Sequence, residues 1–203
     1  MVKCFLAMAQ EPLPIHEHAL ENLRVIRETM ERAGSFTSIP GWGGFAIGLT
    51  AAAAAYLAQR VVADPRAWLR VWLIEAAVAA VIGAVTIWLK WRRTATPFMS
   101  GAARRFFISY FAPLIAGAVL TWSLAHRGSF DPIPAAWLLL YGSAFVSSGA
   151  FSIRVIPAMG VCYMLLGILA ALVRLPVGNL ILGAGFGGLH VIFGLIIARR
   201  YGG

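Results

Sequence analysis

The chain has 203 residues, of which 60% are hydrophobic and only 12% are charged, and its formal net charge is +9. A soluble domain usually carries about 25% charged residues, so this composition excludes an ordinary soluble domain and indicates a membrane protein. The positive charge does not indicate nucleic-acid binding, because the basic residues lie between apolar runs and form no patch on a soluble fold. Cys4 and Cys162 lie far apart, and Cys162 sits within an apolar run, which argues against a disulfide framework or a thiol-based metal site.

The first 41 residues differ in character from the rest of the chain. Leu20, Leu23 and Met30 recur at helical spacing, which predicts an amphipathic cytoplasmic helix over residues 15–34 that ends at Gly34. One interpretation is that this helix lies on the membrane surface or packs beneath a bundle, and the other is that it docks a soluble partner. Its acidic residues outnumber its basic ones, which argues against strong binding to anionic lipid.

Residues 42–203 contain six apolar runs, and each predicts a transmembrane helix. The clearest run extends from Val71 to Trp88, and its only charged residue is Glu75. At about 1.5 Å per residue, residues 67–89 can cross a hydrocarbon core about 30 Å thick. The predicted fold is therefore an all-α, polytopic transmembrane helix bundle, preceded by the short amphipathic helix. The expected spans are residues 44–60, 67–89, 106–125, 134–151, 155–173 and 180–198.

Short motifs predict how these helices begin and pack. Asp64-Pro65 is typical of a helix start, with Asp as the N-cap and Pro at the first helical position. Asp131-Pro132 repeats the pair, which indicates either a faint repeat of helical hairpins or two independent caps. Small residues in the first and sixth spans predict close helix packing, and they are Gly44, Gly48, Gly183 and Gly187.

Tryptophan and basic residues predict the orientation of the bundle. Tryptophans at both ends of the second span, Trp68 and Trp72 at one end and Trp88 and Trp91 at the other, are typical of the two membrane interfaces. Of the 17 lysines and arginines, twelve fall on the side of the six-span arrangement that holds both termini. The positive-inside rule therefore places both termini in the cytoplasm. The predicted cytoplasmic basic face comprises Lys90, Arg92, Arg93, Arg104 and Arg105.

Two polar residues within the apolar runs, Glu75 and His190, form the candidate site. Burying such a side chain in a bilayer costs free energy, so its presence there usually indicates a functional or structural role. Glu75 lies about 12 Å and His190 about 15 Å along their helices from the same side of the membrane. If the two side chains meet, they can relay protons or hold a cation. The alternative is that each only fixes helix packing, Glu75 through Arg70 or a hydroxyl group and His190 through a neighbouring helix. We expect Glu75 to face the interior of the bundle, toward the fifth or sixth span.

Three segments of the chain resemble known sequences: the run from His18 to Arg24, the run from Pro40 to Gly44, and the ending from Ala198 to Gly203. They are similar to a group of uncharacterised bacterial integral membrane proteins of about this length. The resemblance implies a six-span protein of the bacterial inner membrane and brings no assigned activity, so it assigns no role to any residue.

Two hypotheses about function follow from the sequence. The first is a non-enzymatic membrane protein, a subunit, regulator or sensor that docks a protein partner through its cytoplasmic face or assembles as an oligomer or membrane-complex subunit. It predicts no catalytic residue, no cofactor and no metal, since the sequence contains no HExxH, GxSxG or CxxC motif. The alternative is a small proton- or cation-coupled secondary transporter that uses Glu75 and His190.

Overall fold

The computed structural model describes residues 20–26, 30, 40–93 and 101–201. The chain divides into two units, Met1–Gly34 and Ser35–Gly203. In the first unit, residues 20–26 and 30 are helical and exposed. The rest of the helix predicted over residues 15–34 lies outside the described residues.

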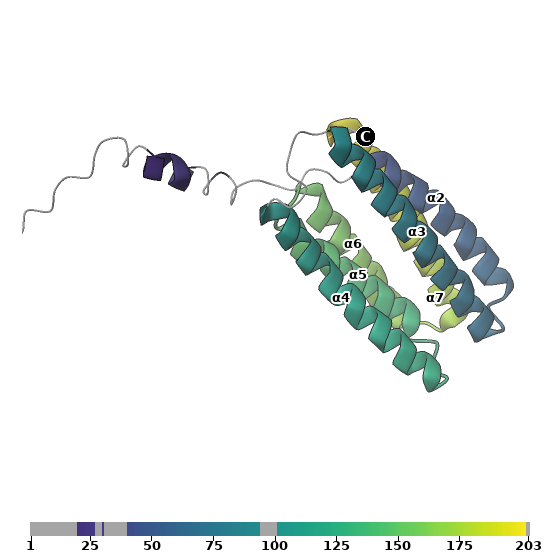
Figure 1. The fold of residues 1–203 in the computed structure, drawn as a ribbon. Coiled ribbons are helices and arrows are strands. Elements are labelled where there is room, and N and C mark those ends of the chain that lie inside the picture. Colours follow the sequence, from purple (N-terminus) through teal and green to yellow (C-terminus); the bar gives the residue numbers. More distant parts are fainter. Residues whose placement is uncertain (1–19, 27–29, 31–39, 94–100, 202–203) are drawn as a thin grey trace, which may run out of the picture. The chain divides into compact units, whose positions relative to one another are not determined.

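The second unit is built from helices (Figure 1). The last three run on without a break from Leu175 to Tyr201, because the π-helical turn η1 joins α7 directly to α8. The elements are α2 (Gly41–Arg60), α3 (Pro65–Arg93), α4 (Gly101–His126), α5 (Ile133–Gly149), α6 (Val155–Ala171), α7 (Leu175–Leu182), η1 (Gly183–Leu189) and α8 (His190–Tyr201).

The described part of the chain has four helical runs that are long and apolar enough to cross a membrane: α2, α3, α4 and the run from α7 to α8. Helices α5 and α6 are also apolar, but each has 17 residues. At about 1.5 Å per residue such a helix is about 25 Å long, somewhat shorter than a typical hydrocarbon core. The chain is thus an all-α, multi-pass membrane protein, and the crossing of the bilayer by α5 and α6 stays a prediction.

The two Asp-Pro pairs act differently. The backbone N–H groups of Arg66 and Ala67 donate to Asp64 Oδ1 at 3.0 and 3.2 Å, so Asp64 caps α3 as predicted. Asp131 Oδ1 instead accepts the backbone N–H of Leu175, the first residue of α7, at 2.9 Å. Asp131 therefore ties the turn between α4 and α5 to the start of α7. It does not cap α5, whose N-cap is Pro132, so the prediction that the second Asp-Pro pair caps its own helix is wrong.

Helices α5 and α6 pack against each other through glycine. A Cβ atom at Gly142 would lie 2.7 Å from the carbonyl oxygen of Gly160 and 2.9 Å from the backbone nitrogen of Met164. Both neighbours are backbone atoms that cannot rotate away, so only glycine allows this approach.

Helix α2 packs against the run from α7 to α8 in a second small-residue seam. Here a Cβ at Gly48 would lie 2.7 Å from the Val191 nitrogen, and one at Gly183 would lie 2.9 Å from the Ala55 Cβ. Gly187 and Gly44 face the same seam at slightly larger distances. The four glycines singled out in the sequence therefore all lie between the first span and the last.

Contacts between neighbouring helices fix their directions. Gly41, at the start of α2, lies against Ala198 near the end of α8, and Gln59 near the end of α2 contacts Asn179 in α7. Helix α4 packs on α5 in the same antiparallel way, since Trp137 Nε1 donates to Thr121 Oγ1 at 2.7 Å. Successive helices therefore run in opposite directions through the bundle.

Candidate functional site

His190 lies at the centre of a polar cluster in the interior of the bundle. It is the first residue of α8 and only 4% exposed. Its Nε2 lies 3.0 Å from the hydroxyl of Tyr141 on α5, and its Nδ1 lies 2.6 Å from the hydroxyl of Tyr163 on α6. The rings of Phe145 and Phe186 pack around the three polar side chains. The site thus joins α5, α6 and α8 through side chains far apart in the sequence.

The π-helical turn η1 explains why the polar groups gather at this point. The backbone N–H of His190 donates to the carbonyl of Gly187. The carbonyl of Phe186 instead accepts from His190 Nδ1 at 2.9 Å, and the carbonyl of Gly185 accepts from the Tyr163 hydroxyl at 2.9 Å. A π-turn disturbs the regular i to i+4 ladder, and here side chains supply donors to carbonyl groups of the turn.

A single arrangement of protons satisfies every group of this cluster. Neutral His190 with its proton on Nδ1 donates to Phe186 and accepts from Tyr141 at Nε2. The Tyr163 hydroxyl then donates its own proton to the carbonyl of Gly185, and its oxygen accepts from the Nδ1–H of His190 as a second acceptor beside Phe186. The tautomer follows from the hydrogen-bond partners. The geometry therefore favours a neutral histidine that couples three helices.

Glu75 lies elsewhere in the bundle interior. It is 8% exposed, and Thr50 Oγ1 on α2 donates to its Oε1 at 2.8 Å. The prediction that Glu75 faces the interior agrees with this burial, but its recorded partner lies on the first span and not on the fifth or sixth. In the described part of the chain, no recorded hydrogen bond joins Glu75 to His190, and no recorded ion pair joins it to Arg70. A lone acid on a uniformly apolar helix gives no periodic signal that fixes its direction.

Asn179, which lies between the predicted fifth and sixth spans, is the centre of a second buried network. It is fully buried, and its Oδ1 accepts the indole N–H groups of Trp68 at 2.8 Å and Trp72 at 2.9 Å. Its amide nitrogen donates to the carbonyl of Ala55 at 3.1 Å and to the side chain of Gln59 at 2.6 Å. One amide thus links α2, α3 and α7, and it uses both of its donors and both lone pairs of its oxygen.

This network corrects the interpretation of Trp68 and Trp72 as markers of the membrane interface. Their exposed fractions are 0% and 3%, and the ring of Trp68 stacks on Trp137. Trp88 at the other end of α3 is 47% exposed, and Trp122 on α4 is 69% exposed, as an interfacial tryptophan would be.

The residues of the predicted basic face lie at the end of the bundle where α3 ends and α4 begins. Lys90 Nζ lies 3.5 Å from the carbonyl oxygen of Tyr201, which places the end of α8 beside it. The guanidinium of Arg92 lies 4.6 Å from the centre of the Trp88 ring. Arg104 and Arg105 are exposed in the first turn of α4. Arg93 is the last residue of α3.

Comparison of the chain with models of protein families, with curated proteins and with solved structures finds no match. Within residues 20–26, 30, 40–93 and 101–201, no group of three or more His, Cys, Asp or Glu side chains is placed to hold a metal ion. The function is therefore inferred from the geometry of the chain itself.

Proposed function

We propose that the chain is a non-enzymatic protein of the bacterial inner membrane, a subunit, regulator or sensor. Its six helical runs cross the bilayer, both termini lie in the cytoplasm, and the basic face docks a protein partner. The observation that carries this proposal is the sorting of charge between the two ends of the antiparallel bundle.

The sorting is visible in the described basic side chains. One end of the bundle carries seven of them: Lys90, Arg92, Arg104, Arg105, Arg154, Arg199 and Arg200. The other end, with the turns after α2, α4 and α6, carries Arg60, Arg66, Arg70, Arg127 and Arg174. The excess supports a cytoplasmic location for the first end, by the positive-inside rule. A dense basic surface also favours rapid association with an acidic partner surface.

The proposal predicts charge-dependent contact with a partner at this face. A photo-crosslinking residue at Gly101, which is exposed and has open space around its Cβ position, should give a discrete adduct in cells. Replacement of Arg104 and Arg105 by glutamate should abolish the adduct, because it reverses the charge of the docking surface. The matched control is the same crosslinker at exposed Ser129, at the opposite end. An adduct that persists after charge reversal, or none at Gly101, would contradict docking at the basic face.

The second candidate is a proton- or cation-coupled transporter, and the surroundings of Glu75 favour it. An intramembrane carboxylate whose recorded partner is the neutral hydroxyl of Thr50 can take up and release a proton without breaking an ion pair. His190, which has its own partners, would act in a separate step.

This candidate predicts that Glu75→Gln abolishes proton flux. The amide keeps the size of the side chain and its bond to Thr50, so the unfolding midpoint should change little. Flux is measured in proteoliposomes with a pH-sensitive dye under an imposed potential. Thr86→Val, which alters another polar side chain of the same helix, is the control and should keep the flux. Equal flux through wild type and Glu75→Gln, or no flux above empty liposomes, would refute the transporter.

A further inference from the structure

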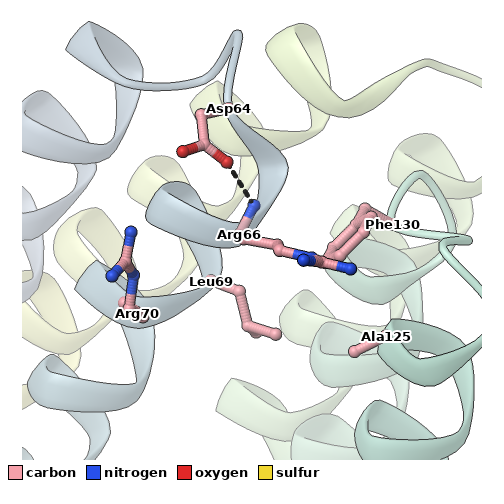
Figure 2. Close-up of a pocket in the computed structure, with 6 residues that line it drawn as sticks. All are labelled: Asp64, Arg66, Leu69, Arg70, Ala125 and Phe130. Atoms are coloured by element: carbon pink, nitrogen blue, oxygen red, sulfur yellow. Dashed lines mark hydrogen bonds between the residues drawn. The ribbon is translucent and has the colours of Figure 1, made fainter.

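A depression opens at the less basic end of the bundle, between the start of α3 and the end of α4 (Figure 2). Its volume is about 400 Å³, within the range of small-molecule sites. Its walls combine cationic and apolar side chains, and the lining residues are Asp64, Arg66, Leu69, Arg70, Ala125 and Phe130. We propose that this depression is a binding site for an anionic glycerophospholipid, with Arg66 and Arg70 holding the headgroup phosphate.

The two arginines provide the recognition of phosphate. They lie four residues apart, so both leave the first turns of α3. The guanidinium of Arg66 extends across the depression toward Phe130, whereas that of Arg70 extends to the other side of α3 (Figure 2). Both side chains are exposed, so Arg70 reaches a phosphate held by Arg66 by a change of its side-chain rotamer. In the described part of the chain, no ion pair is recorded for either guanidinium. A guanidinium matches the oxygens of a phosphate with two parallel hydrogen bonds, which makes arginine well suited to such a headgroup.

Asp64 does not neutralise this site. Its Oδ1 is engaged by the backbone N–H groups of Arg66 and Ala67, as the cap of α3. The dashed line of Figure 2 shows that its contact with Arg66 is made to the backbone and not to the guanidinium. The lining therefore carries two cationic side chains and one acidic side chain, and the acidic one is the N-cap of α3.

The apolar wall and its surroundings favour a lipid over a soluble anion. Leu69 points toward Ala125 across the depression (Figure 2). One turn farther along α3, Leu73 is 50% exposed, and just before Ala125 on α4, Trp122 is 69% exposed. Helix α3 packs mainly on α2, and α4 packs on α5. An acyl chain can therefore follow the apolar surfaces of α3 and α4 away from the headgroup, as a free phosphate cannot.

The binding test uses the full chain in detergent micelles, titrated with phosphatidylglycerol or with phosphatidylcholine. Native mass spectrometry counts the bound lipid, and the unfolding midpoint reports stabilisation. Wild type should prefer phosphatidylglycerol, and Arg66→Gln with Arg70→Gln should lower its apparent affinity about tenfold or more, because two charge-assisted contacts are lost. The matched control removes the same charge from the same end at exposed residues outside the depression, Arg127→Gln with Arg174→Gln, and should bind like wild type.

A second variant tests whether binding needs the open space of the depression as well as the charge of the two arginines. Ala125→Trp fills the depression and leaves both arginines in place, so it should also lower the affinity for phosphatidylglycerol. Inorganic phosphate and glycerol 3-phosphate are tested as competitors, and neither should displace the lipid at millimolar concentration. Unchanged binding in the Arg66 and Arg70 double variant, an equal loss in the control, or displacement by inorganic phosphate would overturn the proposal. Lipid binding at this depression requires only that the helices lie in a membrane, and it does not involve the basic face. A negative result would therefore not contradict the proposal that the basic face docks a protein partner.

Discussion

Replacement of Asn179 by leucine is expected to lower the free energy of unfolding by about 2–4 kcal/mol, a large change for a single residue. The amide group satisfies two indole N–H groups and the side chain of Gln59 in a fully buried place. Each buried polar group left without a partner costs about 1–3 kcal/mol in soluble proteins. Hydrogen bonds within membrane bundles average less, about 0.6 kcal/mol, which limits the sum to the stated range. Reversible unfolding in mixed micelles, followed by tryptophan fluorescence, measures the change.

Two controls make this prediction specific to the network. Trp68→Phe removes one donor and keeps an aromatic ring against Trp137, so it should cost clearly less than Asn179→Leu. Leu180→Ala changes the next residue, which is 58% exposed, and should alter stability by less than about 0.5 kcal/mol. An Asn179→Leu variant as stable as Leu180→Ala would show that the amide does not hold α2, α3 and α7 together.

The helices were predictable from the sequence because their signals are local. An apolar run of sufficient length predicts a membrane helix whatever surrounds it. Helix ends follow from residues such as Asp64 and Pro65, whose effect on the backbone reaches only a few positions. The glycines of the seam between α2 and the last helical run are of the same kind, since a small residue within an apolar run marks a place where another backbone can come close.

The polar networks could not be predicted, because their partners are distant in sequence. Asn179 follows Gly178, a pair that is typical of turns. Pro176, in the first turn of α7, was the one local sign that a helix already begins at Leu175. Trp68 sits where interfacial tryptophans usually lie, and only the packing of Asn179 and Trp137 buries it. His190 was a candidate from the sequence, but its partners Tyr141 and Tyr163 come from two other helices.

The direction of Glu75 illustrates the same limit. The depth of a residue along a membrane helix follows from counting residues, so Glu75 and His190 could be predicted to lie at similar depths in the membrane. Rotation about the helix axis is fixed by which face packs, and α3 is apolar almost all round. The choice of Thr50 as the partner of Glu75 is therefore a property of the packed bundle and not of α3 alone.

We propose that all six helical runs cross the membrane with the basic face inside. Helices α5 and α6 test this proposal most sharply, because they are the shortest of the six runs. Single cysteines are placed at Ser129, Ala150 and Arg174, which are exposed and lie before α5, between α5 and α6, and after α6. The native Cys4 and Cys162 are first replaced by serine and alanine.

The measurement is labelling of these three variants by a membrane-impermeant maleimide in intact cells and again after permeabilisation. The six-span arrangement predicts that Ser129 and Arg174 are labelled in intact cells, whereas Ala150 is labelled only after permeabilisation. Labelling of Ala150 from outside, with protection of Ser129 and Arg174, would reverse the orientation. Labelling of all three positions in intact cells would show that α5 and α6 do not cross the bilayer.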